Sequence, residues 1–296
     1  METFRPKLIL APTDFSETAA HALRYASALA ERFDAHLLVM YADPFMPAVD
    51  FTAIPAATFD LAQQNMIEEA REKLEVHAEE NVGEKVPYDI RVIIGSPVIA
   101  ISNLVRETGA DLIVMGTHGR TGLRRILFGS VTAHVMRVAA APVIAVNSTT
   151  PETAEVRKVL VPVTSEPLCR EALPFAAALT SAPDAPIVFL QFADDDRPLE
   201  DTLDRLLSLQ QWAPDELGSR CEFKIMPGRE ADKSITSLAK FTNSDLIALT
   251  IPEGRGLGDV LRGTLAERVI RQSGCPVLTV NSLVARCAEP TPVMVG

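Results

Sequence analysis

DLIVMGTHGRTGLRRILFGSVTAHVMRVAAAPVIAV, which runs from Asp111 to Val146, is the stretch that decides the fold. Its first five residues are an apolar run typical of a buried strand, and a loop rich in Gly and Arg follows. The pattern G-x2-G-x9-G-S places glycines at Gly116, Gly119 and Gly129 and begins an apolar-periodic helix at Ser130. Free backbone N–H groups and the positive end of a helix converge where such a loop meets a helix. The stretch therefore favours the binding of an anion such as phosphate.

Strands and helices alternate in the residues before this stretch. Apolar patterns predict strands at 7–11, 36–41 and 88–94 and helices at 18–33 and 59–81. Gly95-Ser96-Pro97 is expected to start a third helix, which runs to about Thr108. A Pro- and Ala-rich stretch at 44–58 shows little periodicity and is expected to be a loop or lid. PVIAV at 142–146 supplies a fifth strand. This alternation is typical of α/β proteins with a parallel sheet and helices on both faces.

The second half of the chain repeats the first. KVLVP at 158–162 matches KLILAP at 7–12, and the tripeptide DLI recurs at Asp111 and Asp245. In the same register Gly263-Thr264 falls on Gly129-Ser130, and Pro276-Val277 falls on Pro142-Val143. The second copy is shorter, with the loss between its second and third strands. The polar segment Asn147 to Glu155 reads as a linker. We therefore expect two tandem doubly wound domains, 1–148 and 156–282, each with a five-stranded parallel sheet, and a tail at 283–296.

Composition excludes several classes of protein. The 296 residues suffice for about two ordinary domains. The formal net charge of -11 argues against a general nucleic-acid binder. No secretory signal or membrane span is expected, because no apolar stretch approaches about 18 residues. The four cysteines lack CxxC spacing and the five histidines stand at unrelated spacings, so we expect neither disulfides nor a metal cluster, and a cytoplasmic location.

Two loops are candidates to form one site, because ligands of open α/β sheets bind at the carboxyl ends of the strands. The first, Pro12-Thr13-Asp14, carries a carboxylate and a hydroxyl suited to a ribose or a metal-bound phosphate. In the second, Gly116 and Gly119 let the backbone approach a phosphate without an intervening Cβ. Useful affinity needs several helix-end donors together with cationic side chains. The nearby cations are Arg120, Arg124 and Arg125.

Met40, Tyr41, Ala42 and Met115 could line an apolar slot for an adenine ring.

The residues of the two loops also have simpler interpretations. Glycines after a strand are often only turn residues, and Asp14 or Ser16 could serve as a helix cap. Arg124, Arg125 and His118 could be solvated loop residues. The acidic run Glu68 to Glu80 is expected to be an exposed helix face with i,i+4 ion pairs.

LAPTDFSETA at 10–19, the strand DLIVMGTHG, the complete glycine loop and PVIAV together resemble the universal stress protein family in its ATP-binding branch. The resemblance covers nearly the whole chain as two tandem copies. It implies the fold called adenine nucleotide alpha hydrolase-like. It also implies that ATP lies between the first-strand loop and the glycine loop, with Mg²⁺ as the ion that ATP phosphates usually recruit.

Carried onto matching positions, the resemblance implies three groups of contacts. The adenine and ribose would be held by Pro12, Thr13, Asp14 and Tyr41. The path to the phosphates would be lined by Met115, Gly116 and Gly119, with Arg120 beside them. The phosphates would be bound by Gly129, Ser130, Val131 and Thr132. No catalytic or metal-ligating side chain is assigned.

The second copy departs from this pattern. Its first loop, Pro162-Val163-Thr164, lacks the acidic residue. In its glycine loop Glu253 stands where the first copy has Gly119, and Gly254 comes one position later. We expect this half to bind ATP weakly or not at all. Because single-domain members of the family usually pair, the resemblance implies that the second half is a built-in pseudo-dimer partner, and pairing of whole chains is expected as well. The glycines and the arginine at 254–258 are compatible with the binding of a different ligand by this half.

The sequence favours an ATP-binding stress-response sensor or regulator over a fast enzyme. The first-half loop supplies no obvious pair of nucleophile and base, although slow hydrolysis or self-phosphorylation at Ser130 or Thr121 is compatible with it. An enzyme that acts at the α-phosphate would need a loop of the SGGxDS kind after the first strand, and PTDFSE differs from it. A nucleotide-independent scaffold, whose partner docks on the helical faces or on 44–58, is the other alternative.

Overall fold

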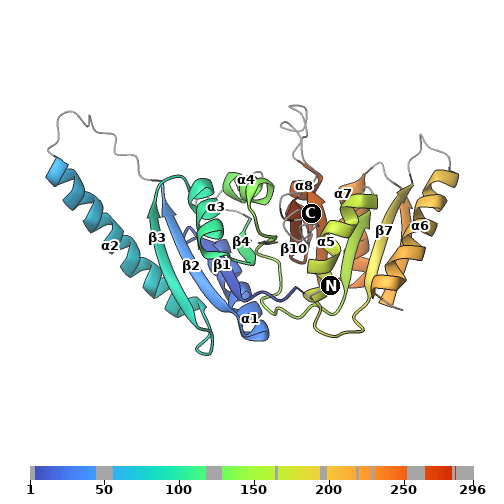
Figure 1. The fold of residues 1–296 in the computed structure, drawn as a ribbon, viewed down its shortest axis with the longest axis horizontal. Coiled ribbons are helices and arrows are strands. Elements are labelled where there is room, and N and C mark those ends of the chain that lie inside the picture. Colours follow the sequence, from blue (N-terminus) through green and yellow to red (C-terminus); the bar gives the residue numbers. More distant parts are fainter. Residues whose placement is uncertain are drawn as a thin grey trace, which may run out of the picture.

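The computed structural model describes residues 4–44, 56–117, 129–163, 166–193, 199–217, 220–227, 230–251, 264–281 and 284. Over these residues the chain forms one ten-stranded sheet with helices on both faces (Figure 1). The strands follow the order β3-β2-β1-β4-β5-β10-β9-β6-β7-β8. Neighbouring strands are parallel within each half, and β5 and β10 pair antiparallel where the halves meet.

The first half confirms the predicted alternation of strands and helices. Its elements are β1 (Leu8–Thr13), α1 (Glu17–Phe33), β2 (His36–Asp43), α2 (Ala56–Asn81), β3 (Tyr88–Ile94), α3 (Pro97–Thr108), β4 (Leu112–Gly116), α4 (Ser130–Val138) and β5 (Val143–Val146). The bounds agree with the predicted ranges to within a few residues. Most of the predicted 44–58 loop lies outside the described residues, and α2 already begins at Ala56.

The second half repeats the same order of elements. They are β6 (Val159–Val163), α5 (Glu166–Ala178), β7 (Ile187–Ala193), α6 (Leu199–Leu217), β8 (Cys221–Pro227), α7 (Ala231–Thr242), β9 (Leu246–Ile251), α8 (Leu265–Gln272) and β10 (Val277–Asn281). Helix α6 has 19 residues where α2 has 26, which places the shortening between the second and third strands of the copy. Both halves are therefore doubly wound, with β1 and β6 at the centre of their own five strands.

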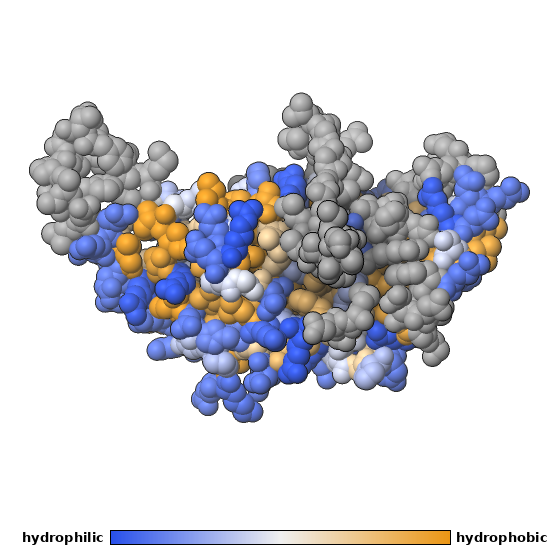
Figure 2. Space-filling view, in the orientation of Figure 1, coloured by the Kyte–Doolittle hydropathy of each residue, from blue (hydrophilic) through white to orange (hydrophobic). Residues whose placement is uncertain are grey.

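Two apolar layers cover the two faces of the sheet. Alternate strand residues point to opposite faces, so Ile9 packs under α1 and α2 while Leu10 packs under α3 and α4. Helices α5 and α6 continue the first layer, and α7 and α8 continue the second. The edge strand β3 is less covered: its last residues are only partly buried, and apolar residues gather over this region in Figure 2. Among the described helices, none combines the length and the apolar character that a bilayer crossing requires.

The repeated DLI motif has the same structural role in both halves. Asp111 Oδ2 accepts the backbone N–H groups of Lys7 and Leu8 at 2.8 and 2.9 Å. Asp245 Oδ2 accepts those of Arg157 and Lys158 at 2.8 and 3.0 Å. In each half the carboxylate thus ties the start of the fourth strand to the start of the first.

Two equivalent asparagines connect the halves. Asn147, which follows PVIAV, donates from Nδ2 to the Ile270 and Ser273 carbonyls at the end of α8, at 3.1 and 2.8 Å. Asn281, which ends PVLTVN, donates from Nδ2 to the carbonyls of Met136 and Ala139 at the end of α4, at 3.1 and 2.9 Å. Helix ends leave carbonyls without intrahelical partners, and each asparagine supplies two of them with donors.

The first helix also reaches across to the second half. Arg32 donates to the carbonyls of Ala154, Leu179 and Thr180, the last two of which follow α5. Near the N-terminus, the rings of Phe4 and Phe175 lie 4.8 Å apart, edge to face. The two halves therefore share one sheet and are also held together through their helical layer.

Candidate functional site

The order of strands reverses at β1, which lies between β2 and β4. The register between β1 and β2 runs to the pair Thr13 and Tyr41. The register between β1 and β4 comprises only Ile9 with Leu112 and Leu10 with Ile113. The carboxyl ends of β1 and β4 thus continue beyond their shared pairing. In open α/β sheets this is the place where ligands bind.

Side-chain to backbone hydrogen bonds fix the loop after β1. Thr13 is 7% exposed, and its Oγ1 accepts the Phe15 N–H at 3.1 Å. Asp14 Oδ1 accepts the Ser16 N–H at 3.0 Å. Ser16 is the N-cap of α1, because its Oγ accepts the Ala19 N–H at 3.2 Å. Of the two candidate caps, Ser16 therefore caps the helix, and Asp14 shapes the turn before it.

The glycines at the two ends of the glycine loop permit close contacts between backbones. A Cβ on Gly116 would lie 3.0 Å from the carbonyl oxygen of Thr18 in the first turn of α1. A Cβ on Gly129 would lie 2.9 Å from the Thr117 oxygen, which accepts the Gly129 N–H at 2.7 Å. Only glycine fits both places without displacing backbone. Close packing of β4 against α1 is therefore enough to explain a glycine at position 116, without the expected approach of a phosphate.

The start of α4 is held on the end of β4. Thr132, which is 3% exposed, donates its hydroxyl to the Gly116 carbonyl at 2.7 Å. Ser130 is exposed and Val131 is partly buried. Gly129 is the N-cap and provides no side-chain cap, and the first turn contains no acidic residue. Gly119, Arg120 and the other loop residues at 118–128 lie outside the described residues.

The equivalent helix end in the second half is different. Thr264 is the N-cap of α8, and its Oγ1 accepts the Glu267 N–H at 3.2 Å. Glu267 adds a carboxylate to this first turn and lies 4.0 Å from Arg137 of α4. Val163 stands where the first half has Thr13. Thr164, Glu253 and Gly254 lie outside the described part of the chain.

The four residues expected to line one apolar slot lie on both faces of the sheet. Tyr41 is 7% exposed and belongs to the core under α1 and α2, where its ring centroid lies 4.6 Å from that of Phe15. Met40, Ala42 and Met115 belong to the core under α3 and α4. The side chains of Tyr41 and Met115 therefore point in opposite directions from the sheet, since strand residues alternate.

His77 of α2 also contacts the end of β1, which its sequence pattern does not predict. Its Nε2 lies 3.0 Å from Thr13 Oγ1, and its ring stands edge-on to Phe15 at 5.4 Å. Burial lowers the pKa of His77 from 6.5, against the opposing influence of the Glu80 and Asp14 carboxylates. A neutral ring suits a nitrogen that accepts the Thr13 hydroxyl proton. One feature of the sequence could have indicated this contact: on a helix, His77 lies beside the apolar stripe of Ala70, Leu74 and Ala78, which is buried in α2.

The rest of α2 has the exposed acidic face that the sequence predicts. The glutamates at 68, 69, 72, 75, 79 and 80 are exposed, and Arg71 and Glu75 form an i,i+4 ion pair at 3.4 Å. Such exposed pairs contribute little to stability. The face of α2 that contacts the end of β1 is its inner face, through His77.

Comparisons with known proteins agree with this architecture. A family model described as the universal stress protein family matches residues 6–147 and 155–281. Two universal stress proteins of Methanocaldococcus jannaschii are 34% and 33% identical over 142 and 155 residues, which is 48% of this chain and 82% and 94% of theirs. The crystal structure of a universal stress protein from Archaeoglobus fulgidus superimposes with a TM-score of 0.72 at 20% identity, covering 94% of this chain and 99% of that one.

Proposed function

The chain belongs to the universal stress protein family, and from this premise we propose that its first half binds ATP as the sensing element of a stress-response regulator. The nucleotide would lie at the carboxyl ends of β1 and β4, between the loop after β1 and the start of α4. Support comes from the strand order, which reverses at β1, and from the position of α4 against the end of β4.

One observation carries this proposal: the two equivalent helix ends have opposite character. The start of α4 has a glycine N-cap and no acidic residue in its first turn. The start of α8 is capped by Thr264 and carries Glu267. A phosphate is attracted to uncapped N–H groups and to the positive helix end, and a carboxylate at that end repels it. We therefore expect one ATP per chain, bound in the first half.

The geometry refines the roles of the proposed contact residues. Pro12, Thr13 and Asp14 would hold the adenine and ribose. Ser130, Val131 and Thr132 would bind phosphates through backbone N–H groups, with the exposed Ser130 hydroxyl as a further donor. The Gly129 N–H is already donated to the Thr117 carbonyl, so Gly129 would contribute by leaving room for the phosphates at the helix start. The Thr132 hydroxyl is already donated to Gly116, so its contribution is to hold the helix end.

The remaining proposed contacts act around this core. Met115 and Gly116 would shape the end of β4, and Tyr41 would support the loop after β1 through Phe15. Gly119 and Arg120 would complete the phosphate site, with Mg²⁺ as companion ion. This set includes no dedicated catalytic side chain, which is consistent with a sensor that hydrolyses ATP slowly at most.

Calorimetric titration with ATP tests the proposal. Wild type is compared with Ser130→Asp, which adds a carboxylate at the start of α4, and with Asn103→Asp, which adds the same charge at an exposed position of α3. An acidic residue in the first turn favours the helix by about 0.3 to 1 kcal/mol, so Ser130→Asp is expected to fold. We expect one ATP per wild-type chain, binding about tenfold weaker in Ser130→Asp, and unchanged binding in Asn103→Asp. Equal affinity in all three proteins, or two ATP per chain, would contradict it.

A further inference from the structure

A continuous series of polar contacts leads from the loop after β1 to the linker between the halves. It begins at Thr13, whose Oγ1 lies 3.0 Å from Nε2 of His77. One turn further along α2, Asn81 donates from Nδ2 to the His77 carbonyl at 2.8 Å. The Thr13 hydroxyl and the Asn81 side chain are thus connected through a single residue. This segment lies in the helical layer behind the proposed nucleotide site.

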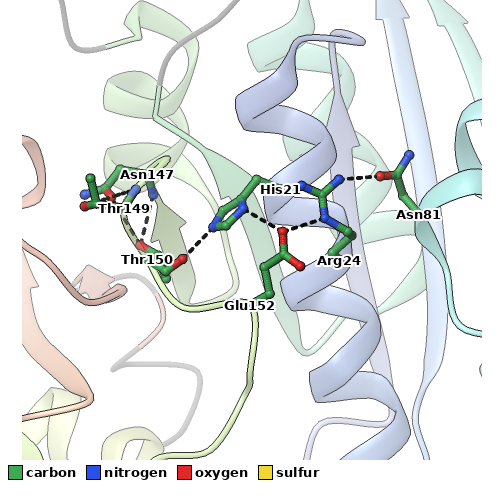
Figure 3. Close-up of polar contacts among 7 residues, drawn as sticks. All are labelled: His21, Arg24, Asn81, Asn147, Thr149, Thr150 and Glu152. Carbon is green, nitrogen blue, oxygen red and sulfur yellow. Dashed lines mark hydrogen bonds and ion pairs between the residues drawn. The ribbon is translucent and has the colours of Figure 1, made fainter.

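Arg24 of α1 carries the series from α2 to the linker. Its Nη1 donates to Asn81 Oδ1 at 2.7 Å, and its Nε donates to Glu152 Oε1 at 2.7 Å. Figure 3 shows the guanidinium between these two partners, with Asn81 on one side and the linker carboxylate on the other. Since a guanidinium keeps its charge and has a planar set of donors, moving either partner changes the hydrogen bond to the other.

His21 secures the same carboxylate from the other side. Its Nδ1 lies 3.1 Å from Glu152 Oε1, and its Nε2 lies 2.7 Å from the Thr150 carbonyl oxygen (Figure 3). Both of these partners are hydrogen-bond acceptors of the linker. The hydrogen bond from Arg24 lowers the pKa of Glu152, which therefore accepts as an ionised carboxylate.

The linker in turn is attached to the second half. Thr149 donates its backbone N–H and its hydroxyl to Asn147 Oδ1 at 2.9 and 2.7 Å. The Nδ2 of Asn147 donates to the carbonyls at the end of α8. Glu152 therefore lies between two fixed points, the loop after β1 through Arg24 and the end of α8 through the linker backbone.

We propose that Glu152 is a positioning residue for the nucleotide site: through Arg24, Asn81 and His77 it fixes Thr13 at the end of β1, and with it the start of the loop that follows. The inference rests on the proposed function of the first half. Its consequence is that ATP binding orders the linker, and that the linker contact strengthens ATP binding by the same factor, because coupling between two sites is reciprocal. The second half would thereby receive a signal about the occupancy of a site it does not contain.

The expected coupling is modest. The Arg24 and Glu152 side chains are 33% and 50% exposed, and partly exposed ion pairs contribute little by themselves. We expect Glu152→Ala to weaken ATP binding about three- to fivefold, as a contact worth no more than about 1 kcal/mol would. The matched control is Glu155→Ala, because Glu155 is an exposed glutamate of the same linker whose partner is Arg157, at 3.8 Å.

The experiment combines calorimetry with hydrogen exchange measured by mass spectrometry, with ATP as the probe. Exchange at 149–154 is expected to slow on addition of ATP in wild type and not in His77→Phe, which keeps a ring but removes the nitrogen that contacts Thr13. A merely structural role for Glu152 would not give this ATP-dependent difference. The inference is overturned if Glu152→Ala and Glu155→Ala bind ATP equally well, or if ATP leaves the exchange at 149–154 unchanged in wild type, or slows it equally in His77→Phe. If wild type binds no ATP, the proposed function fails, and this inference fails with it.

Discussion

Asn147 and Asn281 make the same contact in opposite directions, since each caps the last helix of the other half. Asn147 is 8% and Asn281 4% exposed, and each Nδ2 supplies two helix-end carbonyls. The two contacts flank the antiparallel pairing of β5 with β10. The joint between the halves therefore depends on a residue that each repeat provides at the same place.

Replacement of either asparagine by alanine should weaken this joint. Each change leaves buried carbonyls without their donor, which costs about 1 to 3 kcal/mol of unfolding free energy. Urea unfolding of Asn147→Ala and Asn281→Ala would measure the loss. Asn103→Ala, at an exposed position of α3, is the control and should leave the midpoint unchanged. A loss confined to one of the two asparagines would show that the joint is less symmetrical than its contacts.

Alanine at Gly116 should destabilise the fold even in the absence of nucleotide. The new Cβ would lie 3.0 Å from the Thr18 carbonyl oxygen, and forced overpacking costs about 1 to 3 kcal/mol. Gly274→Ala is the matched control, because no atom lies within 4 Å of its added Cβ. Thermal unfolding without ligand compares the two variants. Equal melting temperatures would mean that α1 shifts without cost, and any loss of ATP binding in Gly116→Ala could then be assigned to the site.

The half-buried ring of His77 should make stability depend on pH. Because burial lowers its pKa in the folded chain from 6.5, the unfolded chain takes up the proton first as the pH falls. The contribution of the neutral ring is complete above 6.5 and is lost as the pH falls from 6.5 through the lower folded value. Urea unfolding at about pH 7.5 and about pH 5.5 should show a larger loss in wild type than in His77→Phe. Parallel losses in the two proteins would assign the pH dependence to other groups.

The aspartates of the two DLI motifs should be equally important for stability. In Asp111→Asn and Asp245→Asn a neutral amide replaces a carboxylate oxygen that accepts two backbone N–H groups, and hydrogen bonds to charged groups contribute about 1.5 to 3 kcal/mol. Chemical denaturation would compare both variants with Asp184→Asn, which changes an exposed aspartate. A loss in only one of the two variants would contradict equal roles for the two aspartates.

The strands and helices were predictable because apolar periodicity is a local signal. The predicted strand 88–94 coincides with β3, and the helix predicted to start at Gly95-Ser96-Pro97 and to run to about Thr108 corresponds to α3. The pairing of β5 with β10 left no such signal, because PVIAV and PVLTVN have the composition that any buried strand would have. Whether two five-stranded sheets stay apart or become one depends on contacts between residues far apart in sequence.

The site was predictable only where local chemistry determines it. A strand followed by glycines and a helix that begins at Ser130 could be identified from sequence, and so could the turn around Asp14. The contact of His77 with Thr13 could not, because 64 positions separate them and charged residues surround the histidine in sequence. The need for glycine at position 116 could not be predicted either, because the backbone that packs against Gly116 belongs to α1, almost a hundred positions earlier.

The continuous sheet has a consequence for aggregation. Separate five-stranded sheets would each expose two edges, and the apolar strands β5 and β10, which are buried throughout, would be among them. Among the strands that the structure describes, their pairing leaves only β3 and β8 as edges, and these carry exposed charges at Asp89, Arg91 and Lys224, which discourage the addition of further strands. A fragment cut at the linker would expose a bare apolar edge and should associate with itself. By pairing β10 with β5, the second half thus also protects the apolar edge strand of the first half from intermolecular pairing.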